Sequence, residues 1–275
     1  MGRFCCILIV LFALVSASIA SESPAPRDRI VVAQSASYIP FAYRDEQGNP
    51  EGILVDLWRL FGEKNGVEIE FRLTDWHDSL DLVRDGGADV HGGMTESKTR
   101  DANFEFAEEI IRVRTLLFVP ANSETVDLVD LVNHKVGVVE SSYDQEFIAY
   151  HFPRVQVETF SDSKSMVDAA IRGDIDAFVS DHPTGYYRLL LANALGEFRS
   201  STTLYTESIR PAAAIGSAEL IEFIDAGFAN LTENEKQRLV DRWLVPEPAQ
   251  PAWLTTLLVG LIATIIVIGT IAHYL

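Results

Sequence analysis

The chain alternates short β-branched runs with amphipathic helical stretches over most of its 275 residues. Residues 30–33 and 67–73 are predicted strands, and between them residues 53–63 place Trp58 and Phe61 at helical spacing with other apolar side chains. Repeated strand and helix patterns of this kind are typical of α/β domains with mainly parallel strands. The hydrophobic content of 48% is enough for two compact units with real cores.

The N-terminal segment has the pattern of a secretory signal peptide. One basic residue, Arg3, comes before the uncharged run 4–15, and residues 18–20 form a small-x-small cleavage pattern. Both cysteines, Cys5 and Cys6, lie inside this segment. We therefore predict that residues 1–20 are removed, and that the exported part has neither a disulfide nor a thiolate metal site.

The C-terminal segment, residues 253–275, is almost wholly apolar and would be about 34 Å long as a helix. A buried core helix of this length would show a polar stripe, whereas this segment has only scattered Thr and the terminal His273 and Tyr274. We therefore predict one transmembrane helix, preceded by a stiff proline-rich linker at residues 246–252.

The composition also bounds the kind of ligand. The formal net charge is −18, and an acidic surface repels phosphate, so nucleic acid is not an expected partner. The six histidines are scattered along the chain, and the sequence contains no glycine-rich phosphate loop. We expect no metal, no cofactor and no catalytic residue, and any anion site must be a local pocket of positive potential.

Residues 92–100 provide the best candidate for such a pocket. Gly92 and Gly93 allow a sharp turn after a buried strand end, and we expect a helix to begin in the Thr/Ser cluster that follows them. Arg100 would then lie about one helical turn beyond Thr95, so that both could hold one carboxylate. The alternative is that Arg100 is a solvated surface residue.

Two further strand ends carry polar residues. Residues 135–139 form a predicted buried strand that ends in Ser142 and Tyr143, followed by a helix from Asp144. A second strand ends on Asp181. A lone Asp in this position is more often a helix cap than a ligand group, so both roles remain open for Asp181.

The order of these parts resembles bacterial extracellular solute-binding protein family 3, the periplasmic amino-acid-binding proteins. The resemblance covers residues 29–243. It is carried by six pieces in the same order and spacing, which are 38–41, the Gly48/Gly52 turn with 55–57, 86–90, 94–100 with 104–106, 136–138, and 173–177 with Asp181.

The resemblance implies a two-lobe α/β fold of the type II periplasmic-binding-protein (Venus-flytrap) class, with the ligand in the cleft between the lobes. It places the solute-binding domain at residues 27–245. One lobe would comprise residues 29–116 and 208–243, and the other residues 118–205.

The same resemblance implies roles for individual residues. Tyr38 matches the aromatic residue that stacks over the ligand, and Thr95 and Arg100 match the carboxylate grip. The remaining matches are Ser142 and Tyr143 at the second-lobe corner, Asp181 for the α-ammonium group and, less firmly, His77 near the ligand side chain.

Three departures from the family pattern stand out. Gly93 replaces a frequent Ser and leaves only its backbone to contribute, and Ser141 stands where a Gly is usual. Ser35 stands where binders of cationic side chains often have an acid, which argues against a Lys or Arg ligand.

Three functions fit this sequence. The first is a membrane-anchored sensory domain that binds an amino acid or related carboxylate, the second a substrate-binding component of an amino-acid importer, and the third a dehydratase on the same fold. The expected location is the inner membrane, single-pass, with the binding domain in the periplasm. Expected partners are the small ligand, the membrane, and a second copy or a separate signalling or transport partner; Thr256, Gly260 and Thr264 form a small-residue face for such a dimer.

Overall fold

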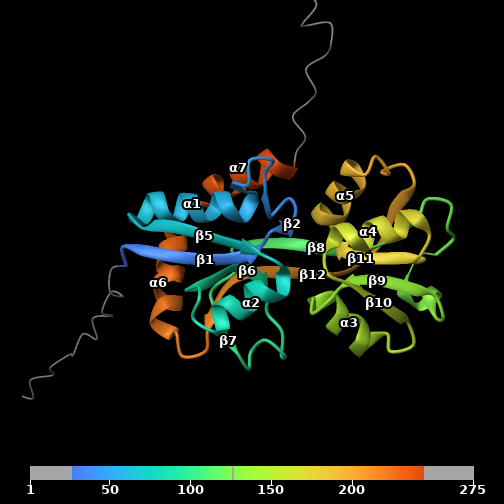
Figure 1. Ribbon diagram of the computed structural model, residues 1–275, viewed down its shortest axis with the longest axis horizontal. Helices are drawn as coiled ribbons and strands as arrows, with labels where there is room; N and C mark the ends of the chain where they lie inside the picture. The colour runs from blue at the N-terminus through green and yellow to red at the C-terminus, as the bar shows by residue number, and fades with distance from the viewer. Residues whose placement is uncertain (1–26, 126, 245–275) are drawn as a thin grey trace, which may run out of the picture.

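The computed structural model describes residues 27–125 and 127–244, which form two α/β lobes side by side (Figure 1). The predicted signal peptide (1–20), the linker (246–252) and the transmembrane helix (253–275) lie outside the described residues and stay predictions. Among the helices that the structure describes, none combines the length and the apolar character that a membrane span requires.

The first lobe contains the N-terminal elements together with the last two helices. Its strands are β1 (Arg29–Ser35), β2 (Ser37–Tyr38), β3 (Ala42–Arg44), β4 (Pro50–Glu51), β5 (Glu68–Thr74), β6 (Val90–Thr95) and β7 (Phe104–Phe106). Its helices are α1 (Ile53–Asn65), α2 (Trp76–Arg84), α6 (Ala218–Ala229) and α7 (Glu233–Leu244).

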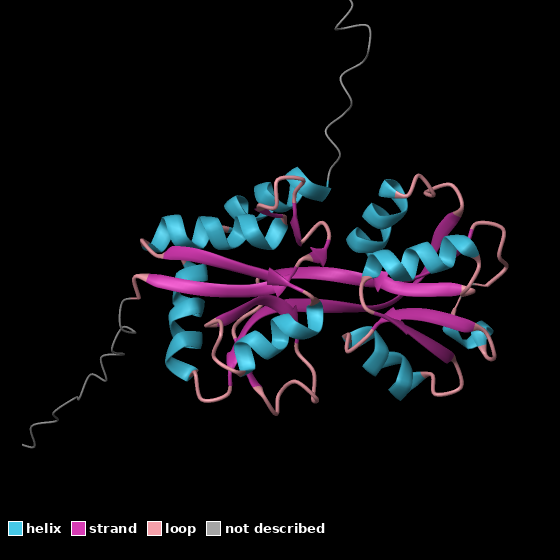
Figure 2. Ribbon diagram, in the orientation of Figure 1, coloured by secondary structure: helices cyan, strands magenta, loops and turns pink. Residues whose placement is uncertain are grey.

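The second lobe is built from the middle of the chain. It comprises the short 3₁₀ helix η1 (Leu128–Leu131), β9 (Lys135–Val139), α3 (Tyr143–His151), β10 (Gln156–Phe160), α4 (Ser163–Arg172), β11 (Ala177–Asp181) and α5 (His182–Leu191). Two long strands, β8 (Ile111–Pro120) and β12 (Phe198–Ala214), run through both lobes (Figure 2).

A single sheet runs through the two lobes. In the part of the chain that the structure describes, its strand order is β10-β9-β11-β8-β12-β6-β1-β5, and β7 pairs with β12 beside this path. β1 is parallel to β5 and β6, and β9 is parallel to β10 and β11. The crossing strands β8 and β12 are antiparallel. Because both strands are continuous, the predicted lobe limits near residues 116–118 and 205–208 fall inside strands, and they remain a proposal.

Each lobe has its own apolar core, as the helical spacing of the sequence predicts. Leu54, Leu57, Trp58 and Phe61 of α1 are fully buried against the first-lobe sheet. The Trp58 indole N–H also donates to the carbonyl of Gly92 at 2.8 Å, which holds β6 against α1. The predicted core face of this helix is confirmed, and it fixes the strand that leads into residues 92–100.

Three local predictions were wrong. Turns rather than a helix follow β6, and Arg100 reaches back to donate to the Thr95 carbonyl. The sequence pattern predicts two separate strands at residues 204–207 and 211–215, but residues 204–207 and 211–214 belong to one strand, β12, because it pairs in turn with β8, β6 and β7. The sequence pattern also predicts a short helix at residues 127–132, where the structure has only the 3₁₀ turn η1.

Candidate functional site

A cavity of about 110 Å³ lies between the lobes. Since one buried water needs roughly 10–15 Å³ by this measure, the cavity has room for several waters or one small organic molecule. The first lobe contributes residues from β2, α2 and β6, the second lobe contributes the starts of α3 and α5, and the crossing strand β12 contributes Glu207. Ligands of two-lobe proteins commonly bind in such a position.

Arg100 is the cation of this cavity and is only 6% exposed. Its Nη1 group donates to the Thr95 carbonyl in the same lobe. Its Nη2 group donates to the Ser141 carbonyl of the second lobe at 3.1 Å. The guanidinium also lies over the Trp76 ring, 5.2 Å from its centroid. Burial lowers the pKa of Arg100, but an arginine keeps its charge in a protein, so this is a fixed positive charge facing the cavity.

The neutral His91 ring packs against the Trp76 ring. The fully buried His91 ring lies edge-on to Trp76 at 5.4 Å, and burial, with the nearby charge of Arg100, lowers the pKa of His91 to about 3. Its Nδ1 accepts from the Gly93 N–H at 3.3 Å, so Nε2 carries the proton and donates to the Ser79 hydroxyl. His91 therefore positions Trp76 without adding a second charge beside Arg100.

The second-lobe corner at the end of β9 presents a backbone carbonyl to the first lobe. Ser141 has a φ of 57°, a left-handed conformation that Gly adopts more easily, so a Gly would suit this position and Ser adopts the same kind of backbone conformation here. Its carbonyl accepts from Arg100 and also from the Trp76 indole at 3.3 Å. Ser142 caps α3 by accepting from the Gln145 N–H at 3.2 Å.

Asp181 is the helix cap that the sequence allowed, and it also lines the cavity, where its role as a ligand group stays a prediction. It accepts from the Thr184 N–H at 2.9 Å as the N-cap of α5, and it lines the cavity while only 7% exposed. Burial and the charge of Glu207 raise the pKa of Asp181 to about 7, against the opposing effect of hydrogen bonding by Thr184 and Tyr38. The carboxyl group is therefore poised to lose its proton near neutral pH.

Three cavity acids were not predicted from the sequence: Asp144, Asp162 and Glu207. Glu207 accepts hydrogen bonds from the hydroxyls of Thr95 and Thr115, the latter at 2.7 Å. Asp144, in the first turn of α3, accepts from the Tyr205 hydroxyl. Burial raises the pKa of the Glu207 and Asp144 carboxyl groups. No local motif marks Glu207 or Asp144, since one sits in a long strand and the other reads as an ordinary acidic residue at a helix start.

The structure brings together six of the seven predicted ligand residues. The cavity is lined by Tyr38, Thr95, Arg100, Ser142, Tyr143 and Asp181. His77 is not among them: it lies in the first turn of α2 with its side chain 71% exposed, 3.8 Å from Asp81. It lines a separate outer groove between α2 and α3, because the helix turns this face toward solvent.

Residues 30–246 match the family model described as bacterial extracellular solute-binding proteins, family 3. The chain belongs to this family. The match spans the whole two-lobe unit, and the expected fold class is confirmed for the two lobes.

Individual relatives of this family 3 protein differ in their described roles. It is similar to the amino-acid-binding protein AabA of Dichelobacter nodosus, with 26% identity over 52% of this chain and 58% of the relative. The chain thus spans less than two thirds of that relative. It is 22% identical to the cyclohexadienyl dehydratase of Pseudomonas aeruginosa over 86% of each chain. Among solved structures, a histidine kinase sensor domain similar to periplasmic binding proteins is 24% identical, with a TM-score of 0.75. The match covers 80% of this chain and 97% of that sensor domain.

The raised pKa of Asp181 predicts that the free energy of unfolding of the ligand-free protein falls as pH rises. Its folded pKa of about 7 lies above the ordinary value of 3.8, so its stabilising effect is present at low pH and is lost as pH rises toward 7. Asp181→Asn keeps the cap but cannot ionise. We expect it to unfold at higher temperature than the parent, with an advantage that grows by roughly 2–3 kcal/mol between pH 5 and pH 8.

Thermal unfolding of both proteins at the two pH values measures this difference. Asp101→Asn, in an exposed turn, is the control and should shift stability equally at both pH values. An equal effect of Asp181→Asn at pH 5 and pH 8 would contradict the assignment.

Proposed function

We propose that this protein binds an amino acid between its lobes. The observation that carries the proposal is the pair of opposite charges on one cavity, Arg100 from the first lobe and Asp181 from the second. An α-amino acid carries a carboxylate and an ammonium group on neighbouring atoms, so it can bridge such a pair. The name of the relative AabA, an amino-acid-binding protein, supports the same ligand class.

The donors around Arg100 suit a carboxylate. A guanidinium has five N–H donors, and two of its nitrogens are used here on the Thr95 and Ser141 carbonyls. The remaining donors can bind a carboxylate oxygen, and the N-terminus of α3 at Tyr143 adds backbone N–H groups and a favourable dipole. An ammonium group beside Asp181 would lower its pKa again and stabilise the ionised carboxylate.

Contacts between the lobes surround the cavity. On one side Ser97 and Thr99 donate to the Glu146 carboxylate at 3.1 and 3.0 Å. On the other side Arg188 donates to the Ser37 carbonyl. These bonds join residues of different lobes, so they require the closed arrangement. A ligand that bridges the lobes would therefore favour this arrangement over an open one.

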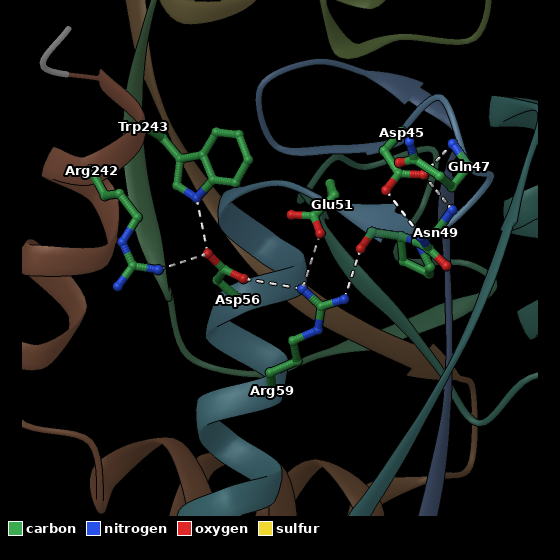
Figure 3. A network of polar contacts seen from close by, with 9 residues as sticks. Asp45, Gln47, Asn49, Glu51, Asp56, Arg59, Arg242 and Trp243 are labelled. Carbon is green, nitrogen blue, oxygen red and sulfur yellow. Dashed lines mark hydrogen bonds and ion pairs between the residues drawn. The ribbon is translucent and has the colours of Figure 1, made fainter. Parts of the chain in front are cut away.

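The end of α7 is bonded to the first lobe (Figure 3). The Trp243 indole donates to Asp56 of α1 at 3.0 Å, and Arg242 lies 3.5 Å from the same carboxylate. Arg59, one turn further along α1, pairs with Asp56 at 3.3 Å. The Tyr43 ring meets the Trp243 ring edge-on at 6.1 Å.

The same end of α7 also contacts the second lobe. The hydroxyl of Tyr187, on α5, donates to the Trp243 carbonyl. Closure of the lobes would thus change the surroundings of Trp243, which comes ten residues before the predicted membrane helix in the sequence. We infer a membrane-anchored sensory role on this ground, and the similarity in fold to a histidine kinase sensor domain supports it. An importer's binding component is the alternative.

A dehydratase is the second candidate function. An acid with a pKa near 7 in a closed cavity can donate a proton to a leaving hydroxyl at neutral pH, and Asp181 has this property. The similarity to the cyclohexadienyl dehydratase favours the same reading. Consumption of a cyclohexadienyl carboxylate such as prephenate by the purified chain would separate catalysis from binding.

Arg100→Ala should abolish amino-acid binding. Loss of one partner of a desolvated charge pair costs about 2–5 kcal/mol, or roughly 30-fold to several-thousand-fold in affinity. A thermal-shift screen of the common amino acids first identifies a binder, since a ligand at a hundred times its dissociation constant stabilises by about 2.7 kcal/mol. Arg112→Ala removes an exposed arginine and should bind like the parent. Unchanged affinity of Arg100→Ala would refute the site.

Tyr187→Phe should weaken binding by a few-fold. The variant loses one hydrogen bond that forms only when the lobes are closed, worth about 1 kcal/mol. The neighbouring Tyr186 lies on the same helix, and Tyr186→Phe is the matched control. Calorimetric titration with the amino acid found in the screen measures both. Equal affinities of the two variants would show that the Trp243 contact does not report closure.

The sensory role predicts that the full chain stays with the inner membrane. Residues 253–275 would hold it there, whereas an importer's diffusible binding component would leave the cell with the periplasmic contents. Osmotic-shock fractionation followed by immunoblotting measures the distribution. A truncation after residue 246 is the control and should be released. Release of the full chain as well would replace the sensory role with the transport role.

A further inference from the structure

The cavity has more carboxyl groups than the α-groups of an ordinary amino acid can pair with. Its lining residues include one guanidinium, Arg100, and the carboxyl groups of Asp144, Asp162, Asp181 and Glu207. The proposed ligand, through its α-groups, would pair with Arg100 and Asp181 alone. Two of the remaining acids, Asp144 and Glu207, are half-buried and accept side-chain hydrogen bonds from hydroxyl groups alone among the described residues, so a second cationic group on the ligand could pair with them.

Among the described residues, Glu207 and Asp144 form no salt bridge, although the charge of Arg100 acts on both carboxyl groups from a greater distance. Within residues 27–125 and 127–244, no Lys, Arg or His nitrogen lies within 4.0 Å of either carboxylate. Their hydrogen-bond donors are the neutral hydroxyls of Thr95, Thr115 and Tyr205. Burial raises the pKa of both carboxyl groups, and the charge of Glu207 raises the pKa of Asp144 further, so both groups are driven toward the protonated form in the ligand-free protein. A cation bound between them would favour the ionised form instead.

The surroundings of Asp144 also favour a cation. Tyr205 meets the Tyr143 ring edge-on at 5.3 Å and the Phe147 ring at 4.4 Å, which places aromatic groups beside the carboxylate. Aromatic faces attract ammonium and guanidinium groups, most strongly where water is excluded. Of these three rings Tyr143 lines the cavity, so an acceptor and an aromatic ring lie together there, as in sites for organic cations.

A buried hydroxyl supplies an independent sign of a ligand. Thr184 is 2% exposed and lines the cavity next to Asp181. By distance and angle, its Oγ1 atom makes no hydrogen bond within the described residues. A buried polar atom is rarely left unpaired, and an ammonium donor held by Asp181 would also satisfy this hydroxyl.

From these observations we propose that the ligand is a diamino carboxylic acid, a basic amino acid with a second cationic group on its side chain. Arg100 binds its carboxylate, Asp181 and Thr184 bind its α-ammonium group, and Asp144 with Glu207 bind the side-chain cation. This inference rests on the proposed function and narrows its ligand class. Position 35, where binders of cationic side chains often have an acid, is Ser in this chain, and Asp144 of α3 and Glu207 of β12 would take the place of that acid.

The test compares charged ligands with neutral isosteres on the full chain, purified in detergent micelles. L-lysine and L-ornithine are titrated against L-norleucine and L-norvaline at pH 7.5 by calorimetry. We expect the basic member of at least one pair to bind ten-fold or more tightly than its isostere. Equal or tighter binding of both isosteres would overturn the inference while leaving the amino-acid site intact, whereas no binding by any common amino acid would refute the proposed function itself.

Variants locate the second cation site. Glu207→Gln and Asp144→Asn should each reduce the preference for the basic ligand by ten-fold or more while they still bind the neutral isostere, which also reports that they are folded. Glu140→Gln removes the same charge from an exposed position of the second lobe and should keep the full preference. Full preference in both cavity variants would overturn the assignment.

A diamine tests the role of the carboxylate. Cadaverine has the two cationic groups of lysine without the carboxylate, so it should bind at least ten-fold more weakly than lysine. Equal binding of cadaverine would overturn the diamino acid in favour of a simple polyamine.

Discussion

The burial of the Arg100 guanidinium between the lobes is the constraint on which the site depends. A charge that cannot be lost by deprotonation needs acceptors and polarisable neighbours when it leaves water. The structure supplies the Thr95 and Ser141 carbonyls and the Trp76 ring. Because one of these acceptors belongs to the second lobe, the same residue that would bind the ligand also joins the lobes.

The neighbours of Arg100 are arranged to leave its charge available. His91 is buried and neutral, so it positions Trp76 without competing as a cation or pairing as an anion. Glu207 and Asp144 accept hydrogen bonds from hydroxyls rather than from the guanidinium. The cavity therefore combines a fixed positive charge with carboxyl groups whose pKa is raised by burial, and a ligand of matching charge would favour their ionised form.

The topology explains how ligand binding could change the contacts at the end of α7. After β12 returns to the first lobe, α6 and α7 pack on that lobe, and Asp56 fixes the end of α7 through Trp243. Tyr187 approaches the same point from the second lobe. Trp243 thus contacts both lobes, and a relative movement of the lobes would change its surroundings directly rather than through a long chain of contacts.

The sequence by itself determined the α/β class, the buried face of α1, the order of the strand-end motifs and six of the residues that line the cavity. The first three features are local, because hydrophobic periodicity, glycine turns and capping residues act over a few positions, whereas the roles of the six cavity residues came from the resemblance to family 3. Tertiary structure alone decided that β12 is one strand, that no helix follows Thr95, that His77 faces solvent, and that Asp144 and Glu207 join Asp181. Those outcomes depend on which distant strands pair and which side chains meet across the lobes, as Glu207 meets Thr115. Such long-range pairing leaves no periodic signal in the residues themselves, since the acid in a strand and the acid at a helix start look the same whether they face water or a cavity.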